Sequence, residues 1–197
     1  MRIILASSSA RRKEIFKQLG IKAEIKVPAI GETILKTPVE TVVCNATRKA
    51  TWVHENQKSN VDSIVLGFDT LVFLEGKILG KPVGRKDSIY MLKSLSGKWH
   101  EVYTGIAVLK NGTLFQDYDK SDVKFHRLTN SQISYYIDSG ENLDKAGSYG
   151  IQDKNMSFIE KIEGSFSNVI GFPLEVCRNL LKKIGVHILE DGNYDLG

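Results

Sequence analysis

The segment that most constrains the fold is Ser63–Leu74, which is apolar along almost its whole length. A strand of this kind belongs in the interior of a sheet that is covered on both faces. Strand-like and helix-like segments alternate before it, and two strand-like segments joined at Asn111-Gly112 follow it. The sequence therefore predicts an α/β or α+β fold in which helices flank a mixed, twisted sheet, with two lobes around a cleft.

Hydrophobic periodicity places the remaining elements. We expect helix Pro38–Glu55 to begin after a capping Thr37, with Pro38 in its first turn and Lys49 on the side opposite its apolar residues. A length of 197 residues suits one domain, residues 1–197. The other expected strands span residues 3–5, 23–27, 99–109 and 113–125, and the other expected helices span residues 11–19, 87–95, 132–137 and 173–184.

Composition narrows the class of protein. The chain has 27 basic and 23 acidic residues, a net charge of +4, which suits an anionic small molecule better than a nucleic acid. Its two cysteines, Cys44 and Cys177, are far apart and indicate neither a disulfide framework nor a zinc site. No apolar run approaches the roughly 20 residues of a membrane span. We therefore expect a cytoplasmic protein with no membrane partner.

The turn after the first strand is suited to binding an anion. Ser7 and Ser9 stand where that strand ends, and Arg11 and Arg12 begin the following helix. Unpaired N–H groups at a helix start, hydroxyl groups and guanidinium groups are all donors to phosphate. An N-capping serine followed by two solvated arginines is the alternative.

Asp69 is the sharpest single position, because a carboxylate inside an apolar strand is costly to bury without a partner. If the strand ends at Gly67, its carboxyl end presents Asp69 and Thr70 to a ligand. The alternative is a structural aspartate that caps a turn. Lys81 lies beside the rigid Pro82 in a segment whose spacing does not fit a phosphate-binding P-loop, and as an isolated lysine it could equally be a solvated surface residue.

Two polar, glycine-rich segments, residues 139–152 and 162–173, have the composition of shaped binding loops, although such loops can also be simple connections. These segments and the features described above together contain several short motifs. Taken in order, this chain resembles the Maf family of nucleoside triphosphate pyrophosphatases in seven short motifs: Ser7-x-Ser9-x-Arg11-Arg12, Gly67-x-Asp69-Thr70, Gly80-Lys81-Pro82, Leu95-Ser96-Gly97, Ser139-Gly140-Glu141, Asp144-Lys145-Ala146-Gly147-x-Tyr149-Gly150-Ile151-Gln152 and Gly164-Ser165.

The resemblance implies a fold similar to that of the inosine triphosphate pyrophosphatases and a homodimer with a nucleotide cleft between two lobes. It also implies a reaction in which water attacks the α-phosphorus of a nucleoside triphosphate and releases pyrophosphate. Asp69 matches the general base of the family, and Glu32 and Asp69 would bind a divalent cation, Mg²⁺ or Mn²⁺, or activate the water. The residues that would bind the triphosphate are Ser7, Ser9, Arg11, Arg12, Lys49 and Lys81.

Substrate choice in the family follows a few positions. The branch that acts on dTTP and UTP carries threonine after the aspartate and glutamine after the Tyr-Gly-Ile run, as Thr70 and Gln152 do here. The 7-methylguanosine branch carries glutamine and glutamate there. An amide can donate to and accept from a pyrimidine, whereas a carboxylate only accepts. Gly31 departs from the pattern, since relatives often carry an acidic residue at that place.

The resemblance implies a house-cleaning pyrophosphatase and leaves open a link to cell-division arrest. The competing hypothesis is a regulator of cell division or septum formation that binds the nucleotide without turnover; it would be expected to keep the cations and lose the base. Nucleic-acid binding is disfavoured because neither Trp52 nor Trp99 lies in a basic patch.

Overall fold

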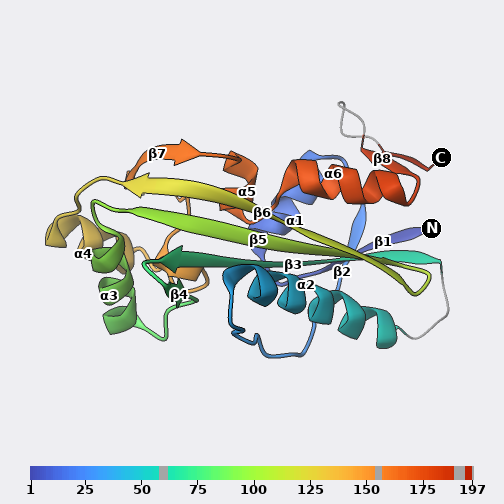
Figure 1. Cartoon of the computed structure of the whole chain (residues 1–197), viewed down its shortest axis with the longest axis horizontal. Coiled ribbons are helices and arrows are strands. Elements are labelled where there is room, and N and C mark those ends of the chain that lie inside the picture. The colour runs from blue at the N-terminus through green and yellow to red at the C-terminus, as the bar shows by residue number, and fades with distance from the viewer. Residues whose placement is uncertain (58–61, 154–156, 189–193, 197) are drawn as a thin grey trace. The chain divides into compact units, whose positions relative to one another are not determined.

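The computed structural model describes residues 1–57, 62–153, 157–188 and 194–196. Within these residues, seven strands form one sheet in the order β2-β1-β3-β5-β6-β7, with β4 paired to β3 (Figure 1). A separate pair, β8 (Val186–Ile188) and β9 (Tyr194–Leu196), lies near the C-terminus. The strands of the main sheet are β1 (Arg2–Ala6), β2 (Ala23–Ile25), β3 (Ser63–Leu74), β4 (Lys77–Leu79), β5 (Trp99–Lys110), β6 (Thr113–Phe125) and β7 (Ile159–Glu163).

The sheet is mixed, as the sequence predicted. β1 runs parallel to both β2 and β3, whereas β4 is antiparallel to β3 and β7 is antiparallel to β6. β5 and β6 are joined at Asn111 and Gly112, which have φ values of 50° and 77°. Positive φ at both central residues is the geometry of a tight hairpin turn, so the predicted hairpin is confirmed.

The helices also follow the sequence closely. α2 (Pro38–Glu55) has the expected bounds, because Thr37 accepts a hydrogen bond from the Glu40 backbone while the Glu40 side chain accepts one from Thr37. α3 begins earlier than expected, and the short α5 and strands β4, β7, β8 and β9 were not anticipated. The remaining helices are α1 (Ala10–Gln18), α3 (Arg85–Leu95), α4 (Asn130–Asp138), the 3-10 turn η1 (Ala146–Ser148), α5 (Phe166–Ile170) and α6 (Leu174–Lys183).

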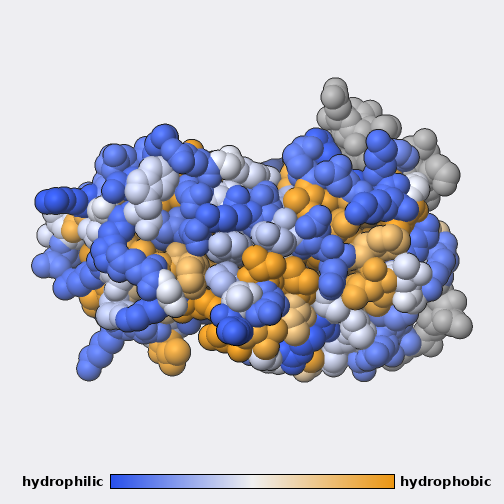
Figure 2. Space-filling view, in the orientation of Figure 1, coloured by the Kyte–Doolittle hydropathy of each residue, from blue (hydrophilic) through white to orange (hydrophobic). Residues whose placement is uncertain are grey.

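The chain divides into two compact units. The first contains Met1–Asp69, Thr104–Asp119 and Gly171–Gly197, and the second contains Thr70–Tyr103 and Lys120–Ile170. Strands β3, β5 and β6 each contribute residues to both units. No helix within the described residues is both long and apolar enough to cross a membrane. Polar residues cover much of the face drawn in Figure 2.

The core of the first unit follows the alternation of its strands. One face packs against α1 and α6, and the other packs against α2, as Figure 1 shows. Ile64, Leu66 and Phe68 of β3 belong to the first cluster, while Val65 belongs to the second. Because side chains alternate across a strand, covering both faces requires the continuous apolar run seen in the sequence.

Two glycines bring α2 unusually close to the sheet. A Cβ added at Gly67 of β3 would lie 2.2 Å from the Ala46 carbonyl oxygen, and one added at Gly105 of β5 would lie 2.4 Å from that of Val42. Such distances are far inside van der Waals contact, so neither position has room for a side chain. The apolar sequence of β3 therefore contains a glycine at position 67 because α2 packs directly against the strand there.

The core of the second unit lies under α3 and α4. Fully buried residues of this cluster include Leu92 and Leu95 from α3, Phe125 from β6 and Tyr136 from α4. Aromatic rings are prominent in it, with Phe125, Tyr136, Tyr149 and Phe158 in edge-to-face contacts. This packing holds the segment that contains η1 against the unit.

Candidate active site

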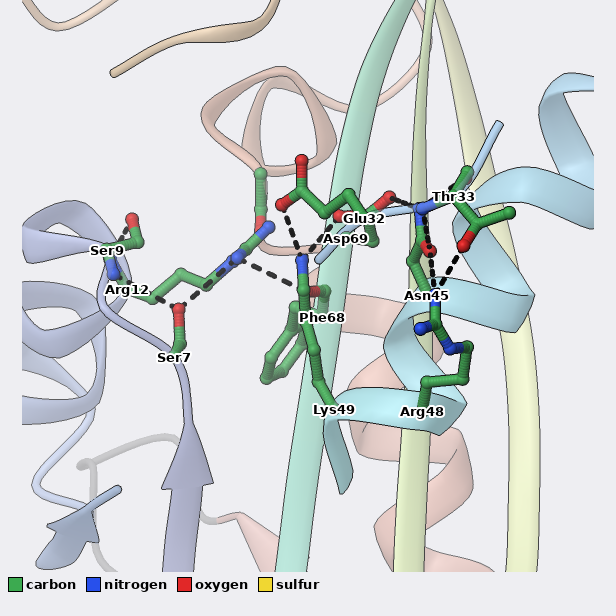
Figure 3. Close-up of polar contacts among 11 residues, drawn as sticks. Ser7, Ser9, Arg12, Glu32, Thr33, Asn45, Arg48, Lys49, Phe68 and Asp69 are labelled. Atoms are coloured by element: carbon green, nitrogen blue, oxygen red, sulfur yellow. Dashed lines mark hydrogen bonds and ion pairs between the residues drawn. The ribbon is translucent and has the colours of Figure 1, made fainter. Parts of the chain in front are cut away.

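The turn between β1 and α1 has the form the sequence predicted. Ser9 is the N-cap of α1, and its hydroxyl accepts a hydrogen bond from the Arg12 backbone at 3.4 Å. Ser7 is 5% exposed, and its Oγ accepts from the Ser9 backbone at 3.2 Å. Both serine hydroxyl groups thus accept hydrogen bonds from backbone N–H groups of the turn and its helix (Figure 3).

Arg12 is a buried residue, so the alternative in which both arginines are solvated is wrong for Arg12. Its side chain donates from Nε to the Gly171 carbonyl at 2.8 Å and from Nη1 to Ser7 Oγ at 3.3 Å and the Phe68 carbonyl at 3.4 Å. The guanidinium also lies 5.3 Å from the centre of the Phe68 ring. Burial lowers the pKa of Arg12 to about 10, with Asp69 opposing the shift, so the group stays charged at neutral pH.

Arg11 differs from its neighbour. It is only half-buried, and its Nη1 atom is buried without a hydrogen-bond partner among the described residues. A buried guanidinium donor without a partner is unfavourable unless something binds it. Arg11 is therefore the better candidate of the two for a direct contact with an anionic ligand.

Asp69 lies inside β3, so the expectation that the strand ends at Gly67 is wrong, and so is the alternative that Asp69 caps a turn. What ends at Gly67 is the pairing with β1, whose last partner pair is Ala6 and Gly67. The pairing of β3 with β4 begins at Val72, and β3 also pairs with β5. Asp69 is only 5% exposed, and burial raises its pKa, while Lys49 and Asn45 oppose that shift.

Lys49 compensates for the buried carboxylate. Its Nζ lies 2.5 Å from Asp69 Oδ1, 2.9 Å from Glu32 Oε1 and 3.4 Å from the Phe68 carbonyl oxygen (Figure 3). The side chain is 13% exposed, so the prediction that Lys49 lies opposite the apolar face of its helix is wrong. The structure thus brings together Glu32, Lys49 and Asp69, three residues that the resemblance implied for the site.

Asn45 is a residue of this cluster that the sequence reasoning missed. It is 3% exposed, and its Nδ2 donates to Asp69 Oδ2 and to the Thr33 carbonyl, both at 3.0 Å. Its Oδ1 accepts from the Thr33 backbone at 2.9 Å. Asn45 therefore fixes the second oxygen of Asp69 and also holds the segment that carries Glu32. The available signal was an asparagine one turn before Lys49 within the apolar stripe of α2.

The oxygens around Lys49 also fit a divalent cation. Mg²⁺ prefers oxygen ligands, and protein sites often supply only one or two carboxylates while phosphate and water supply the rest. Glu32 and Asp69 offer two carboxylates, and their oxygens already converge on one cationic atom. No group of three or more His, Cys, Asp or Glu side chains suited to a metal occurs among the described residues. The donor set therefore fits a cation shared with a phosphate ligand.

The other predicted residues belong to the second unit. Lys81 is exposed, Thr70 is half-buried in β3, and Gln152 is exposed in a turn. The Gly147 backbone donates to the Gly80 carbonyl at 3.0 Å, so the segments that carry Lys81 and Gln152 are hydrogen-bonded to each other. The parts that Lys81, Thr70 and Gln152 play in binding stay predictions.

Comparison with known proteins agrees with the motifs. A dTTP/UTP pyrophosphatase of Thermotoga maritima is 48% identical over 185 residues, covering 94% of this chain and 90% of the relative. A dTTP/UTP pyrophosphatase of Bacillus anthracis is 43% identical over 189 residues, covering 95% and 97%. Among solved structures, the Ham1 protein of Staphylococcus aureus aligns with a TM-score of 0.40 and 12% identity over 64% of this chain and 72% of that chain.

The match to a family model extends over both compact units. The model for the Maf-like protein family matches residues 2–184, which include every residue of the cluster around Asp69 as well as Lys81 and Gln152. By this match, and by its identity to the two pyrophosphatases, the chain belongs to the Maf family.

Proposed function

We propose that this protein hydrolyses dTTP and UTP to the nucleoside monophosphate and pyrophosphate. The observation that carries the proposal is the convergence of Asp69, Lys49 and Glu32 in one partly buried cluster, beside the turn that contains Ser7, Ser9 and Arg12. The identity of 43–48% to relatives that are dTTP/UTP pyrophosphatases supports the choice of substrate.

In the proposed mechanism Asp69 is the general base. It takes a proton from a water molecule whose oxygen attacks the α-phosphorus, and the bond from that phosphorus to the bridging oxygen breaks as pyrophosphate leaves. Lys49 and Asn45 each hold one oxygen of Asp69, so the carboxylate presents a fixed orientation. The raised pKa of Asp69 brings its basicity closer to neutral pH, which favours proton transfer.

The triphosphate requires cationic partners. Arg11 would donate to phosphate oxygens through its unused Nη1, and the Ser7 and Ser9 turn would place backbone and hydroxyl donors beside it. Arg12 would contribute positive charge and fix the turn rather than reach the phosphates freely. Lys81 would act as a further cationic ligand of the triphosphate.

A divalent cation, Mg²⁺ or Mn²⁺, would be held by Glu32 and Asp69 and would neutralise charge on the phosphates. Thr70 and Gln152 would contact the base, where the amide of Gln152 can both donate to and accept from uracil or thymine. We also propose that the protein is a cytoplasmic homodimer.

The direct test is turnover of a panel of nucleoside triphosphates, with separate detection of pyrophosphate and inorganic phosphate. We expect pyrophosphate from dTTP and UTP with the highest kcat/KM, and little turnover of GTP or 7-methylguanosine triphosphate. Tight binding of these nucleotides without release of pyrophosphate would favour the non-catalytic regulator, and preference for a purine would contradict the assignment of the base-binding residues.

A further inference from the structure

Gln152 stands in a turn with a defined geometry. The Asp153 backbone donates to the Gly150 carbonyl at 3.1 Å, which closes a β-turn over residues 150–153. Gln152 is exposed at the third position of this turn. Its side chain can read a base reproducibly only if the two ends of the turn are held in place.

One buried hydroxyl group holds both ends. Tyr136 OH accepts a hydrogen bond from the Gly150 backbone at 3.1 Å and donates to Asp153 Oδ2. Tyr136 lies on α4 and has no exposed surface, and its ring packs against Phe158 at 5.1 Å between centroids. Burial and Asp153 both raise the pKa of Tyr136, so the hydroxyl keeps its proton and remains the donor to the carboxylate.

Lys145 completes the arrangement from the other side. It is 7% exposed, and its Nζ lies 3.4 Å from Asp153 Oδ1 while also donating to the Glu141 carbonyl. A Cβ at Gly150 would lie 2.6 Å from Lys145 Cε and 2.7 Å from Asp153 Oδ2. A side chain at Gly150 would therefore require the ends of the Lys145 and Asp153 side chains to move.

We propose that Tyr136 is a positioning residue for substrate recognition, because its hydroxyl fixes the turn that presents Gln152. The inference rests on the proposed function only in assigning Gln152 to the base. Asp153 and Lys145 support the same turn, and the Tyr136 hydroxyl binds both of its ends. None of these three residues acts on the reacting phosphate in this proposal.

The first test is kinetic and uses Tyr136→Phe, which removes the hydroxyl and keeps the ring. We expect KM for UTP to rise about fivefold or more, the usual effect of losing one binding hydrogen bond, while kcat stays within about twofold. Because the effect passes through Gln152, Tyr136→Phe should change KM by less than about twofold in a Gln152→Ala background. Equal losses in both backgrounds would overturn the proposal and indicate a general loss of packing.

The second test observes the turn itself. Amide hydrogen exchange at Gly150 and Asp153 should accelerate about tenfold or more in Tyr136→Phe, because both amides lose the order that the hydroxyl imposes. Unchanged exchange at these two amides would overturn the proposal. Tyr135→Phe is the matched control, since it removes the hydroxyl of a residue on the same helix that is 66% exposed, and it should leave both readouts unchanged.

Asp153→Asn is the second variant, because it keeps an oxygen to accept from Tyr136 and removes only the charge that faces Lys145. It should change KM and amide exchange less than Tyr136→Phe does, and an equal change in both variants would place the support of the turn in the ion pair with Lys145 and overturn the role of the hydroxyl. If Gln152→Ala leaves KM and the substrate ranking unchanged, base reading by Gln152 fails, and amide exchange alone then decides whether Tyr136 holds the turn.

Discussion

At the scale of single residues, Asp69, the proposed general base, lies inside a strand rather than at its end. We predict that Asp69→Asn lowers kcat by about 10²-fold or more, because the amide keeps the size of the carboxylate but cannot take a proton. Asp62→Asn changes an exposed carboxylate just before the same strand and serves as the control. Near-normal kcat in Asp69→Asn at saturating Mg²⁺ would remove Asp69 from the role of base.

The two adjacent arginines should separate stability from binding. Arg12→Ala removes the side-chain donor to the Gly171 carbonyl and one of the two side-chain donors to the Phe68 carbonyl, so we expect a loss of about 1.5–3 kcal/mol in the free energy of unfolding. Arg11→Ala removes a half-buried side chain and should cost within about 0.5 kcal/mol, yet lower kcat/KM. Urea unfolding and steady-state kinetics on both variants check this, and equal stability losses would contradict it.

His100 should make stability depend on pH. It is 2% exposed, and burial lowers its pKa from 6.5 to about 3, while its Nε2 lies 2.7 Å from the Tyr149 hydroxyl. Below pH 6.5 His100 is protonated in the unfolded chain but stays neutral in the folded protein. Stability therefore falls as the pH drops towards 3. Above pH 6.5 neither state is protonated there, and the effect vanishes.

The size of the effect follows from the same shift. Between pH 6.5 and pH 5, the histidine should remove about 2 kcal/mol from the free energy of unfolding. The measurement is urea unfolding at several pH values, with His100→Gln as the comparison. Because glutamine does not titrate, the variant should have a shallower slope, and parallel slopes would show that other groups dominate.

Among the secondary-structure elements, the close approach of α2 to β3 is the feature most sensitive to a small increase in side-chain size. Gly67→Ala would place a methyl group 2.2 Å from the Ala46 carbonyl oxygen. We expect a loss of about 1–3 kcal/mol in stability, and a fall in kcat because Asn45 and Lys49 move with the helix. Gly31→Ala is the control for stability, since nothing lies within 4 Å of the added Cβ. A stable, active Gly67→Ala protein would contradict this account of the packing.

The same helix shows what the sequence can and cannot predict. The bounds of α2 follow from local signals, the capping Thr37 and the spacing of apolar residues. The end of β3 was predicted wrongly because a glycine in a strand can mark either an interruption or a helix packed on it, and only the tertiary structure distinguishes the two. Asn45 was missed for a related reason, since its partner Asp69 is distant in sequence. Strand β7 was missed because its largely exposed, charged sequence lacks a clear apolar pattern.

For the whole molecule, the three strands that contribute to both compact units imply cooperative unfolding. If one unit unfolds, its residues of β3, β5 and β6 lose their order, and this disturbs the adjoining residues of the same strands in the other unit. Trp52 lies in the first unit and Trp99 in the second. We predict that, within the Trp52→Phe protein and within the Trp99→Phe protein, the urea midpoint followed by the remaining tryptophan coincides with the midpoint followed by circular dichroism. Separate midpoints would indicate independent units.

The shared strands also determine how this protein can be engineered. Separating the two units at their boundaries would cut the chain within three strands, so the halves should not be expressible as independent fragments. The hairpin turn at Asn111 and Gly112 is exposed and lies wholly within the first unit. New termini for a circular permutant, or an inserted reporter domain, are therefore best placed at that turn, where the backbone can be opened without cutting a strand.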